Sequence, residues 1–419
     1  MGRLNRGSES RMNNDLKLWK KKFFIIWTGQ GISSLTSSIV QMAIIWYITN
    51  ETHSAAALSF ATLLGFLPQA VLGMFIGVFI DRYDKKKIMI YSDLCMSLLC
   101  VVLVISGMTG RIPMWLIFIS LFLRSVGNAF YSPSLQATTP SIVPKGQLTK
   151  YAGYAQTFNS AATIASPALA AVLYTIFPLS SILMLDIIGA VLATITLAVV
   201  KIPKPMPEKD IKLNVFKETK EGYEAIRKVP GMRELLIIGA LYAMIYFPIG
   251  TLYPLITMTY FNGSVGESGI VEMIFSAGTL TGSLLLGAGG EKIDKRKAVT
   301  GAIALYGLGT MITGLLSPES FLVFVVLSFF MGISVPFYFG VQTSVFQIKI
   351  DNKYLGRALS LSNSISMIAM PLGLVLSGMF AGIIGIENWF VVSGLTTIGL
   401  AVFAMTLPAL RHCTEDNKR

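Results

Sequence analysis

The sequence predicts an all-α membrane protein with twelve transmembrane helices in two pseudo-symmetric six-helix bundles. Of its 419 residues, 53% are hydrophobic and only 13% are charged, whereas a soluble domain carries about a quarter charged residues. So few charges cannot cover a water-facing surface, and lipid is the solvent that suits the apolar excess. The chain also repeats apolar stretches of about 20 residues, the length that crosses a bilayer.

Twelve apolar stretches are separated by short loops. The first lacks a cleavage site, so we interpret it as a retained helix and not as a signal peptide. Prolines inside the stretches do not argue against these assignments, because membrane helices tolerate them. The predicted spans are 23–49, 57–80, 88–108, 113–135, 150–176, 181–201, 233–259, 268–290, 298–316, 320–344, 355–383 and 387–409.

Positive charge falls on one side of the predicted membrane. All but two of the 34 Lys and Arg residues lie in the chain ends and in alternate loops; the exceptions are Arg111 and Arg124. Basic loops face the cytoplasm, so we expect a membrane protein with both ends inside, N-in and C-in. The net charge of +12 is then a topology signal, and nucleic acid is not an expected partner.

A charged segment in the middle of the chain divides the spans six and six. Three prolines at 203–207 stop helix continuation, and residues 214–228 have the pattern of a short amphipathic surface helix. The predicted organisation is a cytoplasmic tail at 1–22, a bundle at 23–201, a cytoplasmic linker at 202–232, a second bundle at 233–410 and a cytoplasmic tail at 411–419.

The two halves also repeat each other in sequence. Residues 77–87 (GVFIDRYDKKK) recur as residues 287–297 (GAGGEKIDKRK), and Asn159 in the fifth span recurs as Asn363 in the eleventh. Each match falls in the same loop or span of its half. This pattern is typical of parallel six-helix repeats related by an axis along the membrane normal.

The segment 77–87 resembles the loop signature of the major facilitator superfamily, a Gly, then Asp-Arg, then a basic cluster. The resemblance implies the major facilitator fold and a loop that latches the two bundles on the cytoplasmic side. In such a latch Asp81 caps a helix N-terminus and Arg82 pairs across the bundle interface; the plain alternative is a solvated basic loop. The implied latch residues are Gly77, Asp81, Arg82 and Lys86, with Glu291 and Lys292 in a weaker second copy.

Charged residues inside the predicted spans are few, and each is a candidate for proton coupling. Arg124 begins a motif, Arg-Ser-Val-Gly, that resembles the family's fourth-helix motif, in which the arginine assists proton transfer. The alternative is a structural arginine bonded to backbone carbonyls. Histidine is absent from the spans, so carboxyl groups must carry any proton. Asp186 and Glu272 are the first candidates; the alternative for each is a solvated, non-functional position near the end of its span. Asp93 is a third candidate, and it could instead brace the latch beside Arg82.

Polar side chains recur at helical spacing in several spans, and in lipid such stripes turn toward protein or water. The alternative for any single stripe is interhelical hydrogen bonding only. Together the stripes predict a central amphipathic cavity with aromatic walls, suited to large, partly apolar or cationic solutes. The predicted cavity residues are Gln30, Ser34, Ser37, Gln41, Asn159, Tyr242, Tyr246, Ser276, Tyr338 and Gln342.

A closer resemblance is to the bacterial macrolide efflux (Mef) proteins of the drug:proton antiporter group. It rests on stretches such as 27–30 (WTGQ), 63–68 (LLGFLP) and 334–338 (SVPFY), and runs from about Leu18 to about Pro408. It implies proton-driven export of macrolide antibiotics, without a cofactor, across the bacterial cytoplasmic (inner) membrane. A broader multidrug or lipid-linked exporter is the alternative within the class. Outside it, the chain could be a transporter-like membrane partner of an ATPase, a resistance protein or a signalling protein.

Nothing in the sequence indicates an enzyme. No G-x-x-x-x-G-K-[ST] phosphate-binding loop occurs, and no soluble segment is long enough for a nucleotide-binding domain. The three cysteines and two histidines show no metal-ligand spacing.

Overall fold

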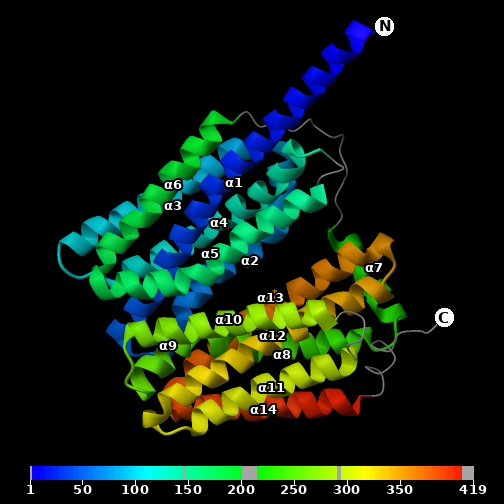
Figure 1. The fold of residues 1–419 in the computed structure, drawn as a ribbon. Coiled ribbons are helices and arrows are strands. Elements are labelled where there is room, and N and C mark those ends of the chain that lie inside the picture. The colour runs from blue at the N-terminus through cyan, green and yellow to red at the C-terminus, as the bar shows by residue number, and fades with distance from the viewer. Residues whose placement is uncertain (1, 145–147, 201–214, 290–293, 408–419) are drawn as a thin grey trace. The chain divides into compact units, whose positions relative to one another are not determined.

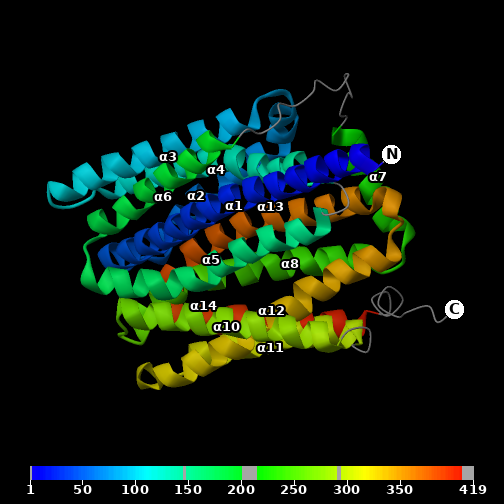
Figure 2. The ribbon, with the colours of Figure 1, turned by 45° about the horizontal axis from the view of Figure 1, so that its top comes forward.

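The computed structural model describes residues 2–144, 148–200, 215–289 and 294–407, with the side chains of some helical residues, including 2–18 and 77–82, left out. All regular elements within these ranges are helical. By their contacts they form two compact units, residues 1–44 with 64–209 and residues 45–63 with 210–419. Figures 1 and 2 show that the long helices of each unit run alongside one another.

Unit 1 is built from the first six helices of the chain. The first helix extends from Gly2, well before the first predicted span, and its last residues, with the start of the second helix, group with unit 2. The helices are α1 (Gly2–Thr52), α2 (Ala55–Arg82), α3 (Lys85–Met108), α4 (Met114–Ile142), α5 (Leu148–Ile176) and α6 (Leu179–Val199).

Unit 2 begins with a short helix and continues with six long segments. The predicted seventh span is interrupted after Thr251, because Pro254 lacks the N–H that would bond to the carbonyl one turn earlier. The elements are α7 (Val215–Lys228), α8 (Met232–Thr251), α9 (Tyr253–Leu255), the π-helical η2 (Ile256–Tyr260), α10 (Val265–Gly289), α11 (Lys295–Leu315), the 3-10 turn η4 (Pro318–Ser320), α12 (Phe321–Lys349), α13 (Asn352–Ile384) and α14 (Ile386–Thr406).

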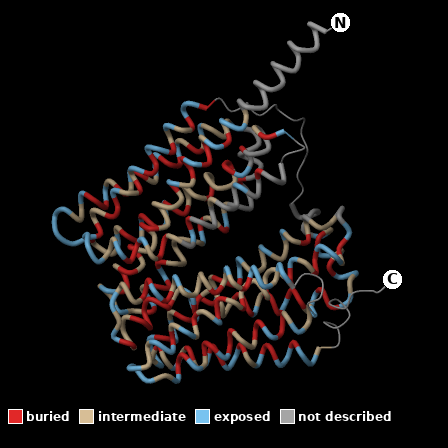
Figure 3. The backbone as a smooth tube through the Cα atoms, in the orientation of Figure 1, coloured by how far each residue is buried: buried red, intermediate tan, exposed pale blue. Residues whose placement is uncertain are grey.

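Eleven helices in the described part of the chain are long and apolar enough to cross a membrane. The predicted fifth span coincides with α5. It is not among the eleven, because its apolar part within the described residues, Ala165–Ile176, is shorter than a membrane span. The membrane class and the helical fold are thus confirmed, while the count of twelve is not. Figure 3 shows buried residues facing neighbouring helices, and large apolar side chains such as Leu98, Trp115 and Ile383 are 62–76% exposed, as a lipid-facing surface requires.

Small residues let several helix pairs within a unit approach to backbone contact. A Cβ added at Gly278 of α10 would overlap the Phe329 carbonyl of α12, and one at Gly332 of α12 would overlap the Phe275 carbonyl of α10. In unit 1 the Thr36 hydroxyl of α1 occupies the space beside Gly189 of α6. These close contacts fix the rotation of the helices that carry the polar groups described next.

The repeated loop performs the same tasks in both units. The side chain of Asp84 accepts a hydrogen bond from the backbone N–H of Lys86 at 3.0 Å and begins α3, and Asp294 begins α11 in the same way. The Lys86 ammonium donates to the carbonyls of Ala198 and Val200 at 2.9 and 3.0 Å, at the end of α6. Its counterpart Arg296 donates to a carbonyl at the end of α14. In each unit the repeated loop therefore caps two helices. Its aspartate caps the N-terminus of one helix, and its basic side chain caps the C-terminus of another.

Candidate functional site

A buried ion pair links α4 to α6 in unit 1. The guanidinium of Arg124 donates to the carboxylate of Asp186, and these residues are 8% and 3% exposed. The Ser37 hydroxyl of α1 donates to the other carboxylate oxygen at 2.5 Å. The guanidinium of Arg124 thus bonds to a carboxylate and a thiol, and not to the backbone carbonyls that the structural alternative requires.

Cys100 of α3 completes this cluster, and the sequence analysis did not assign it a role. Its sulfur accepts a hydrogen bond from Arg124 at 2.9 Å and lies 3.2 Å from an Asp186 oxygen, to which its thiol donates. The sequence could have indicated Cys100 by its spacing. Asp93, Ser97 and Cys100 follow the helical i, i+4, i+7 pattern and lie on the buried face of α3. Four helices, α1, α3, α4 and α6, thus contribute to one polar centre.

Asp93 lies on the same face of α3 and is only 2% exposed. One of its carboxyl oxygens has no hydrogen-bond partner among the described residues. The second predicted role, bracing the latch beside Arg82, concerns a side chain outside the described residues. Among the described residues, unit 1 therefore buries one paired carboxylate, Asp186, and one carboxyl group without an ion pair, Asp93.

A second polar seam joins α2 to α4 and was also missed. The Asn128 amide donates to the Gln69 side-chain oxygen at 3.1 Å, and the backbone N–H of Gln69 donates to the Ser125 hydroxyl at 3.1 Å. Asn128 lies one helical turn after Arg124 and therefore on the same face of α4. Because the arginine marks that face as functional, the sequence did contain a signal for Asn128.

The predicted cavity residues of α1 divide into different environments. Gln30 is 1% exposed, and neither polar atom of its amide has a partner among the described residues. Ser34 and Ser37 are half-buried, and Ser37 serves Asp186 as described. Gln41 is half-buried beside Gly65 of α2. The side chain of Asn159 on α5 lies outside the described residues.

In unit 2 the predicted coupling residue Glu272 lies on α10, half-buried and without an ion-pair partner among the described residues. Ser276, one turn further along the same helix, is also half-buried. The next turn, at Thr279, donates its hydroxyl to the Phe275 carbonyl at 3.2 Å. The polar stripe of α10 is therefore present, and the carboxyl group at its start has no ion-pair partner within the described part of the chain.

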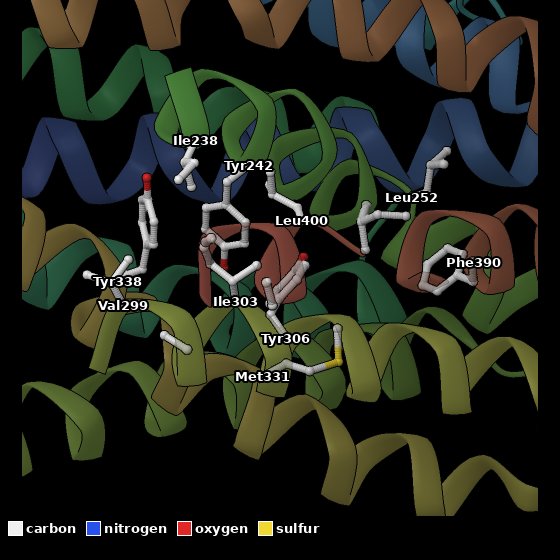
Figure 4. Packing of buried hydrophobic residues seen from close by; sticks show 14 of the residues in the cluster. Ile238, Tyr242, Leu252, Val299, Ile303, Tyr306, Met331, Tyr338, Phe390 and Leu400 are labelled. Atoms are coloured by element: carbon white, nitrogen blue, oxygen red, sulfur yellow. The ribbon is translucent and has the colours of Figure 1, made fainter. Parts of the chain in front are cut away.

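The predicted aromatic wall is a cluster of rings within unit 2. Tyr242 and Tyr338 have ring centroids 4.4 Å apart and are fully buried, while Tyr246 is half-buried with its ring 5.7 Å from that of Tyr242. Tyr306 of α11, which the sequence analysis did not single out, packs against both α8 tyrosines. Gln342 of α12 is 8% exposed. Figure 4 shows Tyr242, Tyr306 and Tyr338 among the surrounding apolar side chains.

The predicted latch can be followed only in part. Gly77 lies on α2, whereas the side chains of Asp81 and Arg82 and all of Glu291 and Lys292 lie outside the described residues. Lys86 is described, and its ammonium is bonded to the end of α6 within unit 1. No group of three or more His, Cys, Asp or Glu side chains within the described ranges could hold a metal ion.

Comparison with known proteins adds to this geometry. The sequence model of a family described as transmembrane secretion effector, MFS_3, matches residues 17–419. Macrolide efflux protein A of Streptococcus pyogenes is 47% identical over 394 residues, covering 94% of this chain and 97% of that protein. The protein of the same name in Enterococcus faecalis is 47% identical over 322 residues, covering 77% of this chain and 99% of that protein.

Solved transporter structures share the fold. A D-xylose-proton symporter has a TM-score of 0.69 at 12% identity, covering 96% of this chain and 99% of that one. A bacterial homologue of the human lysosomal transporter Spinster has a TM-score of 0.68 at 14% identity, covering 92% and 95%. At these identities the likeness concerns the fold alone.

Proposed function

The chain belongs to the transmembrane secretion effector family of the major facilitator superfamily, and on that premise we propose that it exports macrolide antibiotics in exchange for protons. The observation that carries the proposal is the 47% identity to Macrolide efflux protein A, which extends over 94% of the chain. The likeness therefore includes both units and the helices that carry the buried charges.

A proton gradient supplies enough free energy for this export. One proton crossing about 100 mV releases about 2.3 kcal/mol, which corresponds to roughly a fifty-fold concentration ratio at about 1.4 kcal/mol per tenfold. The transporter needs no nucleotide for such a ratio. It does need a group inside the membrane that binds and releases the proton.

Glu272 is the carboxyl group that we assign to this step. The sequence left Asp186, Glu272 and Asp93 as candidates, and among the described residues only Asp186 has a counter-ion. Asp186 is matched by Arg124, Ser37 and Cys100, so its charge is already neutralised. Glu272 has no such counter-ion among the described residues, and partial burial without a counter-ion favours the protonated form of a carboxyl group. Asp93 is the reserve candidate in unit 1.

The orientation that we propose is N-in and C-in, in the bacterial cytoplasmic membrane. It rests on the distribution of the Lys and Arg residues in the sequence. Asn262 lies in an exposed turn between η2 and α10, which this orientation places outside. A cysteine at Asn262 should react with an impermeant reagent in whole cells, and a cysteine at Lys209 should react only after permeabilisation. The opposite labelling pattern contradicts the orientation.

The test of function uses the purified chain in liposomes with an acidic lumen. An antiporter should accumulate a radiolabelled macrolide as protons leave, and an uncoupler should abolish that accumulation. Glu272→Gln should lose accumulation but keep macrolide counterflow, because exchange involves no net proton movement. If the wild-type chain moves neither macrolide nor protons by itself, a partner-dependent role replaces the proposed one.

A matched experiment in cells addresses the latch. Asp81→Asn should abolish macrolide resistance in a susceptible host while the protein remains at wild-type abundance, because the loop loses the anion implied for the latch. Glu291→Gln should have a smaller effect. Equal loss of resistance in the two variants contradicts an asymmetric latch.

A further inference from the structure

The hydrogen bond between α2 and α4 leaves most of its two amide groups unused. The Asn128 amide donates to the Gln69 side-chain oxygen at 3.1 Å. Each side-chain amide carries two N–H donors and a carbonyl oxygen, so this bond uses one donor of Asn128 and one acceptor position of Gln69. The amide N–H groups of Gln69 and the amide oxygen of Asn128 have no hydrogen-bond partner in the described part of the chain. A contact that only joined the two helices would not require these additional groups.

A third amide lies beside the same part of α2. Gln41 of α1 makes no hydrogen bond among the described residues, and a Cβ added at Gly65 would lie 3.8 Å from its side-chain nitrogen. Gly65 precedes Gln69 by one helical turn, so the two residues share a face of α2. Amides from α1, α2 and α4 therefore lie around two successive turns of α2, all within unit 1.

The three amides are accessible as well as close to α2. Gln41, Gln69 and Asn128 are all half-buried. Hydrocarbon offers no hydrogen-bond partner, so polar groups with unused donors turn away from lipid. We infer that the exposed parts of these amides face water or a dissolved ligand, in contrast to Gln30 of the same α1 stripe, which is 1% exposed.

The amides of α2 and α4 are held on a rigid support. The backbone N–H of Gln69 donates to the hydroxyl of Ser125 at 3.1 Å, and Ser125 is 3% exposed. Two turns further along α2, Ile76 forms a buried apolar cluster with Ala129 of α4. The two helices are thus fixed to each other beside and beyond the amides. Groups that are in place before a ligand arrives lose little entropy on binding it.

The chemistry of these amides selects a class of ligand group. The charged residue one helical turn before Asn128 is Arg124, and its guanidinium already bonds to Asp186. The amides themselves are uncharged, and they both donate to and accept from neutral oxygen atoms. Hydroxyl and carbonyl groups therefore fit better than an anion or a cation. A macrolide carries such groups on its lactone ring and its sugars.

We propose that Gln41, Gln69 and Asn128 form a subsite in unit 1 that binds hydroxyl and carbonyl groups of the exported substrate; this rests on the function proposed above. The amide N–H groups donate to the oxygens of the ligand, and the Asn128 oxygen accepts from its hydroxyl groups. These bonds replace those that water makes while the subsite is empty. A small number of placed polar groups determines orientation and specificity in a ligand site, so the subsite favours substrates rich in oxygen.

A double variant, Gln69→Met with Asn128→Leu, removes the amides and keeps side chains of similar size. We expect the apparent KM for counterflow of a radiolabelled macrolide to rise by about tenfold, which corresponds to about 1.4 kcal/mol, with little change in the maximal rate. A macrolide whose hydroxyls are methylated can no longer donate hydrogen bonds. Methylation should therefore raise the KM of the wild type more than that of the double variant.

A second variant and a control separate binding from helix packing. Gln41→Met should also raise the KM while the thermal midpoint stays at the wild-type value, because Gln41 makes no hydrogen bond within the described ranges that the fold would lose. Gln136→Met is the matched control. Gln136 is an exposed amide of the same α4 and donates to the Ser132 hydroxyl at 3.4 Å, so this variant should keep the wild-type KM.

The outcomes distinguish the subsite from the proposed function. If the seam between α2 and α4 only joins the helices, the double variant loses thermal stability but keeps its KM, and Gln41→Met changes neither; this result overturns the subsite. An equal effect of methylation on the wild type and the double variant overturns it as well, because the hydroxyls then bind elsewhere. Absence of macrolide counterflow in the wild-type chain overturns the proposed function, whereas counterflow with unchanged KM in the variants overturns the subsite alone.

Discussion

Asp186→Asn should destabilise the fold by leaving the buried Arg124 charge without its counter-ion. The side chains of Arg124 and Asp186 are 10% and 4% exposed. Removing one partner of a buried pair costs about 3–5 kcal/mol, whereas an exposed pair contributes at most about 1 kcal/mol. We expect a loss of about 3 kcal/mol, at the low end of the range for buried pairs, because Cys100 still accepts a hydrogen bond from the guanidinium at 2.9 Å.

A double-substitution cycle isolates the pair from other effects of the change. Arg124→Met should be destabilising by itself, since it leaves Asp186 charged. The double variant, Arg124→Met with Asp186→Asn, should recover most of the loss, because two neutral groups replace the pair and such replacements are often near neutral. If each single change costs about 3 kcal/mol and the double variant costs about 1 kcal/mol, the expected interaction energy is about 5 kcal/mol, above the roughly 0.5–3 kcal/mol usual for contacting residues.

The assay is unfolding of the purified protein in mixed micelles by titration with SDS, followed by tryptophan fluorescence. Cys100→Ala serves as the control, because it keeps both charges and should cost only about 1 kcal/mol. A double variant whose loss equals the sum of the two single losses would refute the reasoning, since the charges would then be stabilised independently. The same variants should be tested for macrolide counterflow, which shows whether the pair also serves transport.

Two further substitutions test the packing of unit 2. Gly373→Ala should lower the amount of folded protein, because the new methyl would overlap the Met244 carbonyl of α8 and overpacking costs about 1–3 kcal/mol; Gly382→Ala on the same helix meets nothing within 4 Å and should fold normally. Arg357→Gln breaks its ion pair with Glu221, which joins α13 to α7, and should increase tryptic cleavage near α7. Because both side chains are about one-third exposed, we expect a cost of no more than about 1 kcal/mol, and unchanged cleavage would show that the ion pair does not hold α7.

The positions of the helices could be predicted from the sequence because apolar length alone determines a membrane span. The interruption after Thr251 could not, since Pro254 is equally compatible with a continuous kinked helix. The count of twelve depended on α5, whose described apolar part is only Ala165–Ile176. Length and hydropathy thus identify membrane helices, but they do not determine local backbone geometry.

The chemistry of the candidate site was predictable residue by residue but not as an arrangement. Arg124 and Asp186 stood out because charges inside a span are rare. Their pairing could not be deduced, because the two residues lie on different helices and the rotation of each helix depends on tertiary packing. Cys100 and the Gln69–Asn128 bond were missed for a related reason, since neutral polar groups in a span are common and gain meaning only from their neighbours.

The repeated loop shows why a sequence motif can carry more than one role. Its resemblance to the superfamily signature implies a latch centred on Asp81 and Arg82, yet Lys86 and Arg296 each bind the terminal carbonyls of the last helix in their own unit. A basic residue at a helix C-terminus stabilises that end whatever the transporter is doing. Loss of transport on changing the basic cluster therefore does not by itself identify the latch. The cap and the latch differ in their effect on unfolding, because loss of a cap weakens one unit even when no substrate or gradient is present.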